Sequence, residues 1–332
     1  MLQVNVCPSA NTEAGTSPDL CGTKAVNPNG SLQVQVCGTA PLNSRMAVTE
    51  SRIVGGQDAA AGQWPWQAML QIPVAGGTAL CGGSLINSQW ILSAAHCFKS
   101  TSNVVVSLGR ITEQGSNPHQ VSLSVSKIIV HPNYDSSTNN NDLTLLKLAS
   151  PVTFNDYISP ICLAAAGSDF PGGTSSWVTG FGTLSSGGQG PLASTLQEVN
   201  IPIVSNTQCN SAYGGITNQM ICAGLTTGGL DSCQGDSGGP LVIKNSTRWV
   251  QAGVVSFGEG CAKPDFPGVY ARVSEFQPWI SSQVDGPTPG FVDFGSYSNI
   301  TSTSGPKGGV SATKAAVVLV VLPVFFSSFI LS

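Results

Sequence analysis

The chain has 332 residues, a formal net charge of −4 and only 9% charged residues. It has no basic run, which argues against nucleic acid or an anionic membrane surface as a partner. Its ten cysteines include no C-x-x-C pair, so we expect disulfides and an oxidising compartment rather than a zinc site. No cofactor and no metal site is expected, and the carboxylates in the loop that follows Arg110 are too few for calcium.

Residues 1–52 are rich in Pro, Asn, Ser, Gly and Thr, and we expect little regular structure there. The first residues contain no apolar run of the length a secretory leader needs, which indicates an incomplete start. LQVNVC at residues 2–7 is echoed by LQVQVC at residues 32–37. This short repeat indicates a duplicated leader or exon rather than a repeat fold.

Residues 53–284 have the texture of a β protein. Short runs such as VVVSLG, VSLSVSKIIV, LTLLKL and VQAGVVSF are separated by Gly, Pro, Asn and Ser, as is typical of antiparallel strands in barrels. We expect a turn of helix near residues 94–98. A second helix is expected over residues 273–284, where Val273, Phe276, Trp279 and Ile280 recur at helical spacing.

The motif DSCQGDSGGP at residues 231–240 surrounds Ser237 with glycines. A serine hydroxyl is a poor nucleophile until a base takes its proton and preorganised N–H groups receive the developing oxyanion. Gly235 permits a positive φ and close approach to a substrate carbonyl, so the N–H groups of Gly235 and Ser237 could form one oxyanion hole. Taken alone, the run is equally compatible with a glycine-rich turn.

The positions of the histidines decide between two kinds of hydrolase. GDSGG also fits the G-x-S-x-G elbow of α/β-hydrolases, where the base histidine follows the serine. Here His96, His119 and His131 all precede Ser237, which excludes that order. His96 in LSAAHCF and Asp142 in NNNDLTLLKL instead complete the order His, Asp, Ser of chymotrypsin. We interpret His119 and His131, each beside a proline, as structural residues.

Seven segments in order make residues 53–284 resemble a trypsin-like serine protease of the chymotrypsin family. They are RIVGG at 52–56, WPWQ at 64–67, CGGSLI at 81–86, LSAAHC at 92–97, NDLTLLKL at 141–148, WVTGFG at 177–182 and GDSGGP at 235–240. The resemblance implies an all-β fold of two six-stranded antiparallel barrels with the active site between them and a C-terminal helix. The chain is similar to membrane-anchored members of the prostasin and testisin type.

The resemblance also implies a serine endopeptidase that works through an acyl-enzyme. His96 would be the general base for Ser237, and Asp142 would fix the imidazole tautomer. Asp231 takes the place of the specificity-pocket aspartate, which selects Arg or Lys side chains. Residues Gly258 and Gly268 match the open walls of that pocket, and Ser256 to Gly258 would pair with an extended substrate, although Phe257 replaces the usual tryptophan.

Activation is implied by the IVGG motif that follows Arg52. In the family, cleavage at such a place frees an α-ammonium, here on Ile53, which inserts beside the aspartate that precedes the nucleophile, here Asp236. The residues support this implication, because a carboxylate in an apolar, glycine-rich setting needs a cation. Arg45 is another trimming site, but the MAVT that follows it would not supply the inserting terminus.

The resemblance implies disulfide pairs next to the expected site and a tether to the activation segment. The pairs are Cys81 with Cys97, Cys209 with Cys222, Cys233 with Cys261, and Cys162 with Cys7, Cys21 or Cys37. Of the three partners for Cys162 we favour Cys37, which leaves Cys7 to pair with Cys21 if the start of the chain is real. Where many relatives have one more bridge, this chain has Ser176 and Ile243, so both partners of that bridge are missing.

Residues 285–314 are expected to form a Gly, Ser, Thr and Pro stalk, followed by the apolar tail 315–332. Sequons for N-glycosylation begin at Asn29, Asn245 and Asn299. The tail follows small residues and a polar spacer, which fits a glycosylphosphatidylinositol (GPI) signal with attachment at Ser302. The alternatives are a marginal transmembrane helix and a secreted protein whose tail is trimmed.

The leading hypothesis is therefore a zymogen at the extracellular face of the plasma membrane, anchored by lipid. Its expected partners are protein or peptide substrates with Arg or Lys before the scissile bond, an activating protease and protein inhibitors. One alternative is a proteolytically dead homologue that serves as a surface ligand. Another is a subtilisin-like enzyme that uses Asp58, His96 and Ser237, which would require alternating helices and strands.

Overall fold

The computed structural model describes residues 37–44, 56–98, 103–184, 190–229 and 232–295, together with the backbone of three short strands nearer the N-terminus. Several residues singled out from the sequence lie outside this part of the chain. They are Cys7, Cys21, Asn29, Arg45, Arg52, Ile53, Asp231, Asn299, Ser302 and the tail 315–332.

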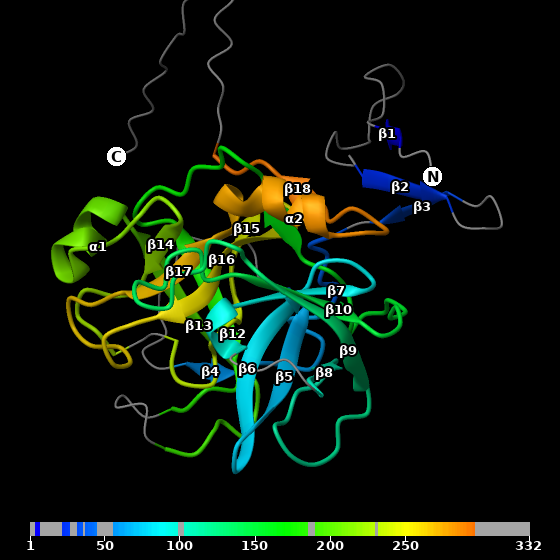
Figure 1. Ribbon diagram of the computed structural model, residues 1–332, viewed down its shortest axis with the longest axis horizontal. Coiled ribbons are helices and arrows are strands. Elements are labelled where there is room, and N and C mark those ends of the chain that lie inside the picture. The colour runs from blue at the N-terminus through cyan, green and yellow to red at the C-terminus, as the bar shows by residue number, and fades with distance from the viewer. Residues whose placement is uncertain are drawn as a thin grey trace, which may run out of the picture. The chain divides into compact units, whose positions relative to one another are not determined.

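The first barrel is a closed ring of antiparallel strands (Figure 1). Its strands are β5 (Gln67–Val74), β6 (Gly77–Leu85), β7 (Trp90–Ser93), β8 (Val105–Leu108), β9 (Val121–Val130) and β10 (Thr144–Leu148). They follow the order β10, β7, β6, β5, β8, β9, and β9 pairs again with β10. The β-branched and leucine-rich runs form these strands because such side chains pack well on a pleated inner face.

The second barrel closes in the same way, and its strands lie beside those of the first (Figure 1). Its strands are β12 (Ser175–Gly180), β13 (Gln197–Val204), β14 (Met220–Ala223), β15 (Pro240–Asn245), β16 (Arg248–Phe257) and β17 (Gly268–Arg272). They follow the order β15, β12, β13, β14, β17, β16, and the pairing of β15 with β16 closes the ring. The expected fold of two six-stranded antiparallel barrels is confirmed.

Apolar side chains fill the barrels and the space between them. Trp66, Trp90 and Leu70 are fully buried and belong to one cluster with Trp249 of β16, so this core crosses the junction of the barrels. A second cluster of buried apolar side chains, which includes Tyr270, Ile221 and Leu241, fills the second barrel. Because both barrels are packed solid, the catalytic groups must lie at their junction rather than inside either one.

The bridge that many relatives have is replaced by ordinary packing. Ser176 and Ile243 are both buried, on the neighbouring strands β12 and β15. Ser176 Oγ donates a hydrogen bond of 2.6 Å to the carbonyl of Ile201. A hydroxyl with a partner and an apolar side chain thus occupy the two positions without leaving a buried polar group unsatisfied.

Two helical segments lie where the sequence predicts them. A turn of 3-10 helix, η1, spans Ala95–Cys97, and the C-terminal helix is divided into η2 (Val273–Phe276) and α2 (Gln277–Gln283). The rings of Phe276 and Trp279 meet His131 edge to face, which gives that histidine its structural role. Burial lowers the pKa of His131.

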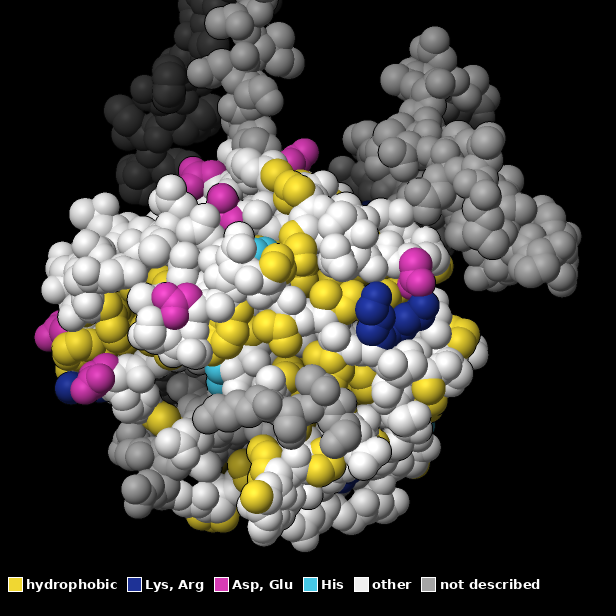
Figure 2. All heavy atoms as spheres, in the orientation of Figure 1, with side chains coloured by type: hydrophobic (Ala, Val, Ile, Leu, Met, Phe, Trp, Pro, Cys, Tyr) yellow, Lys and Arg dark blue, Asp and Glu magenta, His cyan; other side chains and the backbone are white. Residues whose placement is uncertain are grey.

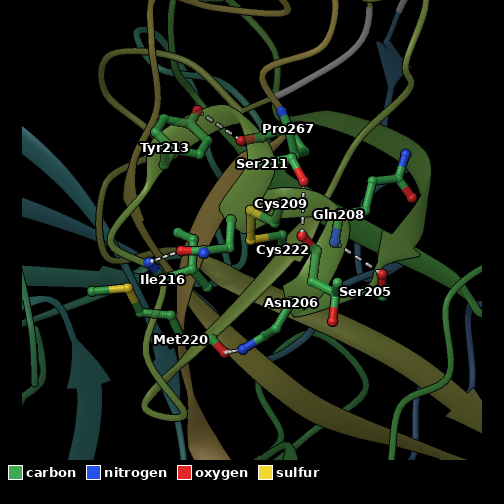
Figure 3. The surroundings of a disulfide bond; sticks show 12 residues. Ser205, Asn206, Gln208, Cys209, Ser211, Tyr213, Ile216, Met220, Cys222 and Pro267 are labelled. Atoms are coloured by element: carbon green, nitrogen blue, oxygen red, sulfur yellow. Dashed lines mark hydrogen bonds between the residues drawn. A yellow bond between two sulfur atoms is a disulfide. The ribbon is translucent and has the colours of Figure 1, made fainter.

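Helix α1 (Asn206–Tyr213) was not predicted. Ser205 caps its N-terminus by accepting a hydrogen bond from Gln208 N, and Gly214 ends it with a φ of 72°. Cys209 joins it to Cys222 of β14, as Figure 3 shows. Because Cys209 is its one buried residue, the helix lacks a 3.6-residue apolar pattern. Its capping signals, S-x-x-Q before and Gly after, were present in the sequence.

The N-terminal segment has more regular structure than expected. Strand β2 (Gly22–Val26) pairs antiparallel with β1 (Val4–Val6) and with β3 (Leu32–Gln35). The two copies of the repeat supply β1 and β3, and the equivalent residues Val4 and Val34 both pair with Lys24. In both copies Leu and Val alternate with Gln or Asn, and this alternation of apolar and polar residues was a signal for the strands of the small sheet.

Residues 285–295, expected as the beginning of a stalk, pack on the protease domain; we call them the strap. Lys147 Nζ lies 2.6 Å from Asp285 Oδ2, and β18 (Phe291–Val292) runs parallel to β11 (Cys162–Ala164), which in turn pairs with β16. The ring of Phe294 stacks on Phe170, 5.1 Å between centroids. The described part of the domain therefore extends beyond the expected boundary at Val284, to Gly295.

Charged groups are sparse on the surface. On the face drawn in Figure 2, acidic and basic side chains stand at a few scattered places on a mostly uncharged surface. Among the described residues, no helix is both long enough and apolar enough to cross a membrane.

Candidate active site

The segment around Ser237 lies against the first barrel. Gly82 N of β6 donates a hydrogen bond of 2.7 Å to Ser237 O, and Gly238 N donates to Val255 O of β16 at 2.9 Å. Gly238 has a φ of 82°, and a Cβ there would overlap Ser93 Oγ. Only glycine tolerates both conditions, so the GDSGG run places Ser237 at the junction of the barrels.

His96 and Asp142 come together on the side of the first barrel. His96 lies in η1, and Asp142 lies two residues before the start of β10. His96 Nδ1 is 2.7 Å from Asp142 Oδ2, and the backbone N–H of His96 donates to Asp142 Oδ1 at 2.9 Å. The Asp142 carboxylate is fully buried, whereas the His96 side chain is 27% exposed. The aspartate thus fixes the ring through Nδ1 and leaves Nε2 for a reacting group.

Ser256 supplies a third hydrogen bond to this aspartate. Its hydroxyl donates to Asp142 Oδ2 at 2.5 Å from strand β16 of the second barrel. The sequence predicts only that the backbone around Ser256 pairs with the substrate, and it does not predict this role of the hydroxyl. Nothing near Ser256 in the sequence indicates it, because Asp142 is 114 residues away.

The disulfide between Cys81 and Cys97 lies beside both the nucleophile segment and the histidine. Cys97 Sγ lies 3.7 Å from Ser237 O and 4.0 Å from His96 Nε2. The Ser237 hydroxyl has no hydrogen bond to any described residue. Bonds between nucleophile and base are often long in unliganded enzymes and shorten when substrate binds, so the arrangement is compatible with base catalysis.

The backbone before Ser237 forms a turn with two N–H groups free. Asp236 N donates to Cys233 O at 3.0 Å, and Gly239 N donates to Asp236 O at 2.8 Å. Between these bonds the N–H groups of Gly235 and Ser237 have no partner among the described residues. Gly235 has a φ of 98°, which only glycine adopts readily. Two unpaired donors in one tight turn are what an oxyanion hole requires.

Asp236 faces a cavity of about 160 Å³ that is also lined by Gly56, Gly180 and Gly182. Its carboxylate accepts hydrogen bonds from Gly182 N at 2.8 Å and from Cys233 N at 2.9 Å. Desolvation raises the pKa of Asp236 to about 6, against the opposing effect of these two bonds. Among the described residues Asp236 has no ion-pair partner.

The walls of the expected specificity pocket are described, although Asp231 is not. Gly268 is buried in β17, Gly258 is exposed at the end of β16, and Tyr270 OH lies 3.4 Å from Ser232 Oγ. Phe257 meets Tyr213 edge to face, 5.8 Å between ring centroids. This second aromatic ring supports Phe257 at the position where relatives usually have tryptophan.

Four disulfides are present in the described residues, and they are the pairs that the resemblance implies. They join Cys37 with Cys162, Cys81 with Cys97, Cys209 with Cys222 and Cys233 with Cys261. Cys37 is thus the partner of Cys162. The tether is buried, with Cys37 4% and Cys162 0% exposed.

Other residues from the sequence analysis lie away from the junction. His119 stacks on Tyr157, with 3.4 Å between the ring centroids. Asp58 accepts a hydrogen bond from Gln197 Nε2 at 2.6 Å. Together with the barrel fold, this excludes the subtilisin-like triad. Asn245 lies at the end of β15, where its side chain donates to Asp293 O at 3.4 Å.

The chain forms two closed barrels. A histidine–aspartate pair lies on one side of their junction, and a glycine-flanked serine lies on the other. This arrangement defines a serine endopeptidase of the chymotrypsin fold. A family model described as Trypsin matches residues 53–280. The chain therefore belongs to the trypsin family and is a hydrolase that acts on proteins or peptides.

Proposed function

We propose that the protein is a zymogen that becomes active when the bond between Arg52 and Ile53 is cleaved, and that it then hydrolyses peptide bonds after Arg or Lys. The observation that carries the catalytic part is the set of hydrogen bonds by which Ser256 and His96 share the buried Asp142 carboxylate. A buried aspartate with these partners has a clear use in orienting a base.

The proposed mechanism has two steps. His96 Nε2 takes the proton from Ser237 Oγ as this oxygen attacks the scissile carbonyl carbon, and the oxyanion is received by the N–H groups of Gly235 and Ser237. The imidazolium then gives the proton to the nitrogen of the scissile bond. The C–N bond breaks, the amine departs, and an acyl-serine ester remains. A water molecule, deprotonated by His96, hydrolyses the ester and restores the hydroxyl.

The proposed specificity rests on Asp231, which is six residues before Ser237 in the sequence. A carboxylate at the bottom of a slot favours the long cationic side chains of Arg and Lys. Gly258 and Gly268 support this proposal, because neither carries a side chain that would fill such a slot.

The proposed activation rests on the cavity beside Asp236. Its volume, about 160 Å³, would accommodate an ammonium group with an aliphatic side chain, and among the described residues no cation pairs with Asp236. Gly56 lines this cavity three residues after Ile53, so the segment that cleavage would release leads into it. A buried ion pair formed on cleavage would order the turn that carries Gly235.

The test uses Arg52→Gln beside the wild type, each treated with a trypsin-like activator. We expect wild type to gain activity on Arg and Lys peptides as its Arg52–Ile53 bond is cut, whereas Arg52→Gln stays folded and inactive. Full activity of an uncut Arg52→Gln protein would refute the activation. A wild type that stays inactive after complete cleavage would instead favour the dead homologue.

For location we propose the extracellular face of the plasma membrane, with a GPI anchor at Ser302, as in the membrane-anchored prostasin and testisin type. The sequence order of small residues, polar spacer and apolar tail supports this proposal. A phosphatidylinositol-specific phospholipase should release the protease from intact cells. Retention beside a released anchored control would favour the transmembrane alternative, and protease found only in the medium would favour secretion.

A further inference from the structure

Glu198 is a buried carboxylate that the proposed hydrolysis does not use. It lies on β13 with 1% of its surface exposed. Trp64 Nε1 donates to its Oε2 at 2.7 Å, and Gln57 Nε2 donates to its Oε1 at 2.5 Å. Each oxygen therefore accepts an N–H bond. The two donors contact different oxygens, and a glutamine would turn its NH2 group toward one of them, so the site favours a carboxylate.

The bond from Gln57 ties Glu198 to the segment that follows the proposed cleavage site. Gln57 and Asp58 form β4, which pairs antiparallel with β13, with Gln57 opposite Glu198. Gly56 and Glu198 both line the cavity that contains Asp236. The new N-terminus would thus be anchored at its fifth residue, next to the cavity it has to enter.

We propose that Glu198 is a positioning residue for activation, which holds Gln57 so that the Ile53 ammonium reaches Asp236. This inference rests on the proposed cleavage after Arg52. Three residues, 53–55, precede Gly56, and an extended chain covers at most about 3.3–3.6 Å per residue. The reach of the ammonium is therefore set by where Gln57 is held. Two of the four residues from Ile53 to Gly56 are glycines, which lose much conformational entropy when they are ordered. Insertion of the Ile53 terminus into the cavity is therefore costly in entropy unless Gln57, at the other end of this segment, is already fixed.

The experiment compares cleaved wild type with cleaved Glu198→Gln and Gln57→Ala. The readout is the rate at which an amine-acylating reagent modifies the Ile53 α-amine, which is proportional to the fraction of termini outside the cavity. Loss of a hydrogen bond to a charged group should raise this rate about tenfold in both variants. If a large fraction of the Ile53 termini lies outside the cavity, active-site titration should count fewer active molecules. The KM of the molecules that remain active should be unchanged.

The matched control is Asp58→Ala, which removes the Gln197–Asp58 bond of 2.6 Å from the same strand pair, at a residue that does not line the cavity. Its labelling rate should equal that of wild type. Gln57→Ala leaves the Trp64 bond to Glu198 intact, so it tests the inference even if Glu198→Gln does not fold.

Wild-type labelling rates in both Glu198→Gln and Gln57→Ala would overturn the role of Glu198 while leaving the activation in place. A wild-type terminus that reacts as fast as a free peptide after cleavage would overturn the proposed activation itself, and this inference with it. The two failures are therefore distinguishable.

Discussion

Ser256 Oγ donates a hydrogen bond of 2.5 Å to Asp142 Oδ2, although Ser256 belongs to the second barrel and Asp142 precedes a strand of the first. The same carboxylate accepts the backbone N–H of His96 and contacts its ring. These partners replace the water that a fully buried carboxylate loses, and they make the orientation of His96 depend on the docking of the barrels.

Ser256→Ala should lower kcat about ten- to a hundredfold with little change in KM, because the lost hydrogen bond is one to a charged group. Steady-state kinetics on an Arg peptide measures the effect. The control is Ser176→Ala, which removes another buried hydroxyl, bonded to Ile201 O. That variant should be less stable but keep its kcat. Equal kcat values for Ser256→Ala and wild type would contradict the proposed role.

Asp142→Asn should lower kcat by about 10⁴-fold, because the amide would donate to Nδ1 and hold the imidazole in the wrong tautomer. The fold should persist, since Asn keeps the shape of the side chain. Circular dichroism and active-site titration test the two statements separately. A loss below about tenfold would show that Asp142 does not orient His96.

Asp231→Ser should lower kcat/KM for Arg and Lys substrates by about 10²–10³-fold, because the cationic side chain would be buried without its partner. Substrates with an aromatic residue in the same position should be affected much less. The measurement is the ratio of kcat/KM for matched Arg and Phe peptides. If this ratio stays at the wild-type value, the pocket assignment is wrong.

The uncleaved Arg52→Gln zymogen should lose stability as pH rises from about 4 to 6. The pKa of Asp236 is raised to about 6 in the folded state from an ordinary value of 3.8, because burial disfavours its charge. Between these values the folded state binds more protons than the unfolded state, so the free energy of unfolding falls with rising pH. Denaturant titrations at several pH values measure it.

Two comparisons test which group causes the free energy of unfolding to fall with rising pH. Adding Asp236→Asn to Arg52→Gln should remove this contribution to the slope. Cleaved wild type should also lack it if the Ile53 ammonium pairs with Asp236, because a cation lowers the pKa of a carboxyl. The same slope in all three proteins would point to a different titrating group.

Gly290→Ala should destabilise the protein by about 1–3 kcal/mol, since overpacking forces neighbouring groups to shift. A Cβ at this place in the strap would overlap Cys37 Sγ of the tether disulfide. Displacement of the strap should also speed the reduction of the Cys37–Cys162 bond by a thiol. Thermal unfolding and timed alkylation measure the two effects. The control is Gly77→Ala, where an added Cβ would meet nothing within 4 Å.

Much of the site was predictable because its motifs are local. Short sequence motifs indicate the tight turn at Gly235–Gly239 and the small residues before His96. The chain order of His96, Asp142 and Ser237 excludes the α/β-hydrolase arrangement. The strands were recognisable because short runs of β-branched residues are separated by short stretches of turn residues. Helix α1, with one buried side chain, had no such periodic pattern.

Tertiary structure decided the contacts between residues far apart in the chain. The sequence determined a β protein with the nucleophile, base and orienting aspartate of a trypsin-family protease. It did not indicate that Ser256 would reach Asp142, that Glu198 would be buried against Gln57, or that the strap would cover Cys37. Each of these contacts forms only when barrel closure and docking bring separate segments together. A single serine, glutamate or glycine in a strand or loop carries no local signal of its distant partner.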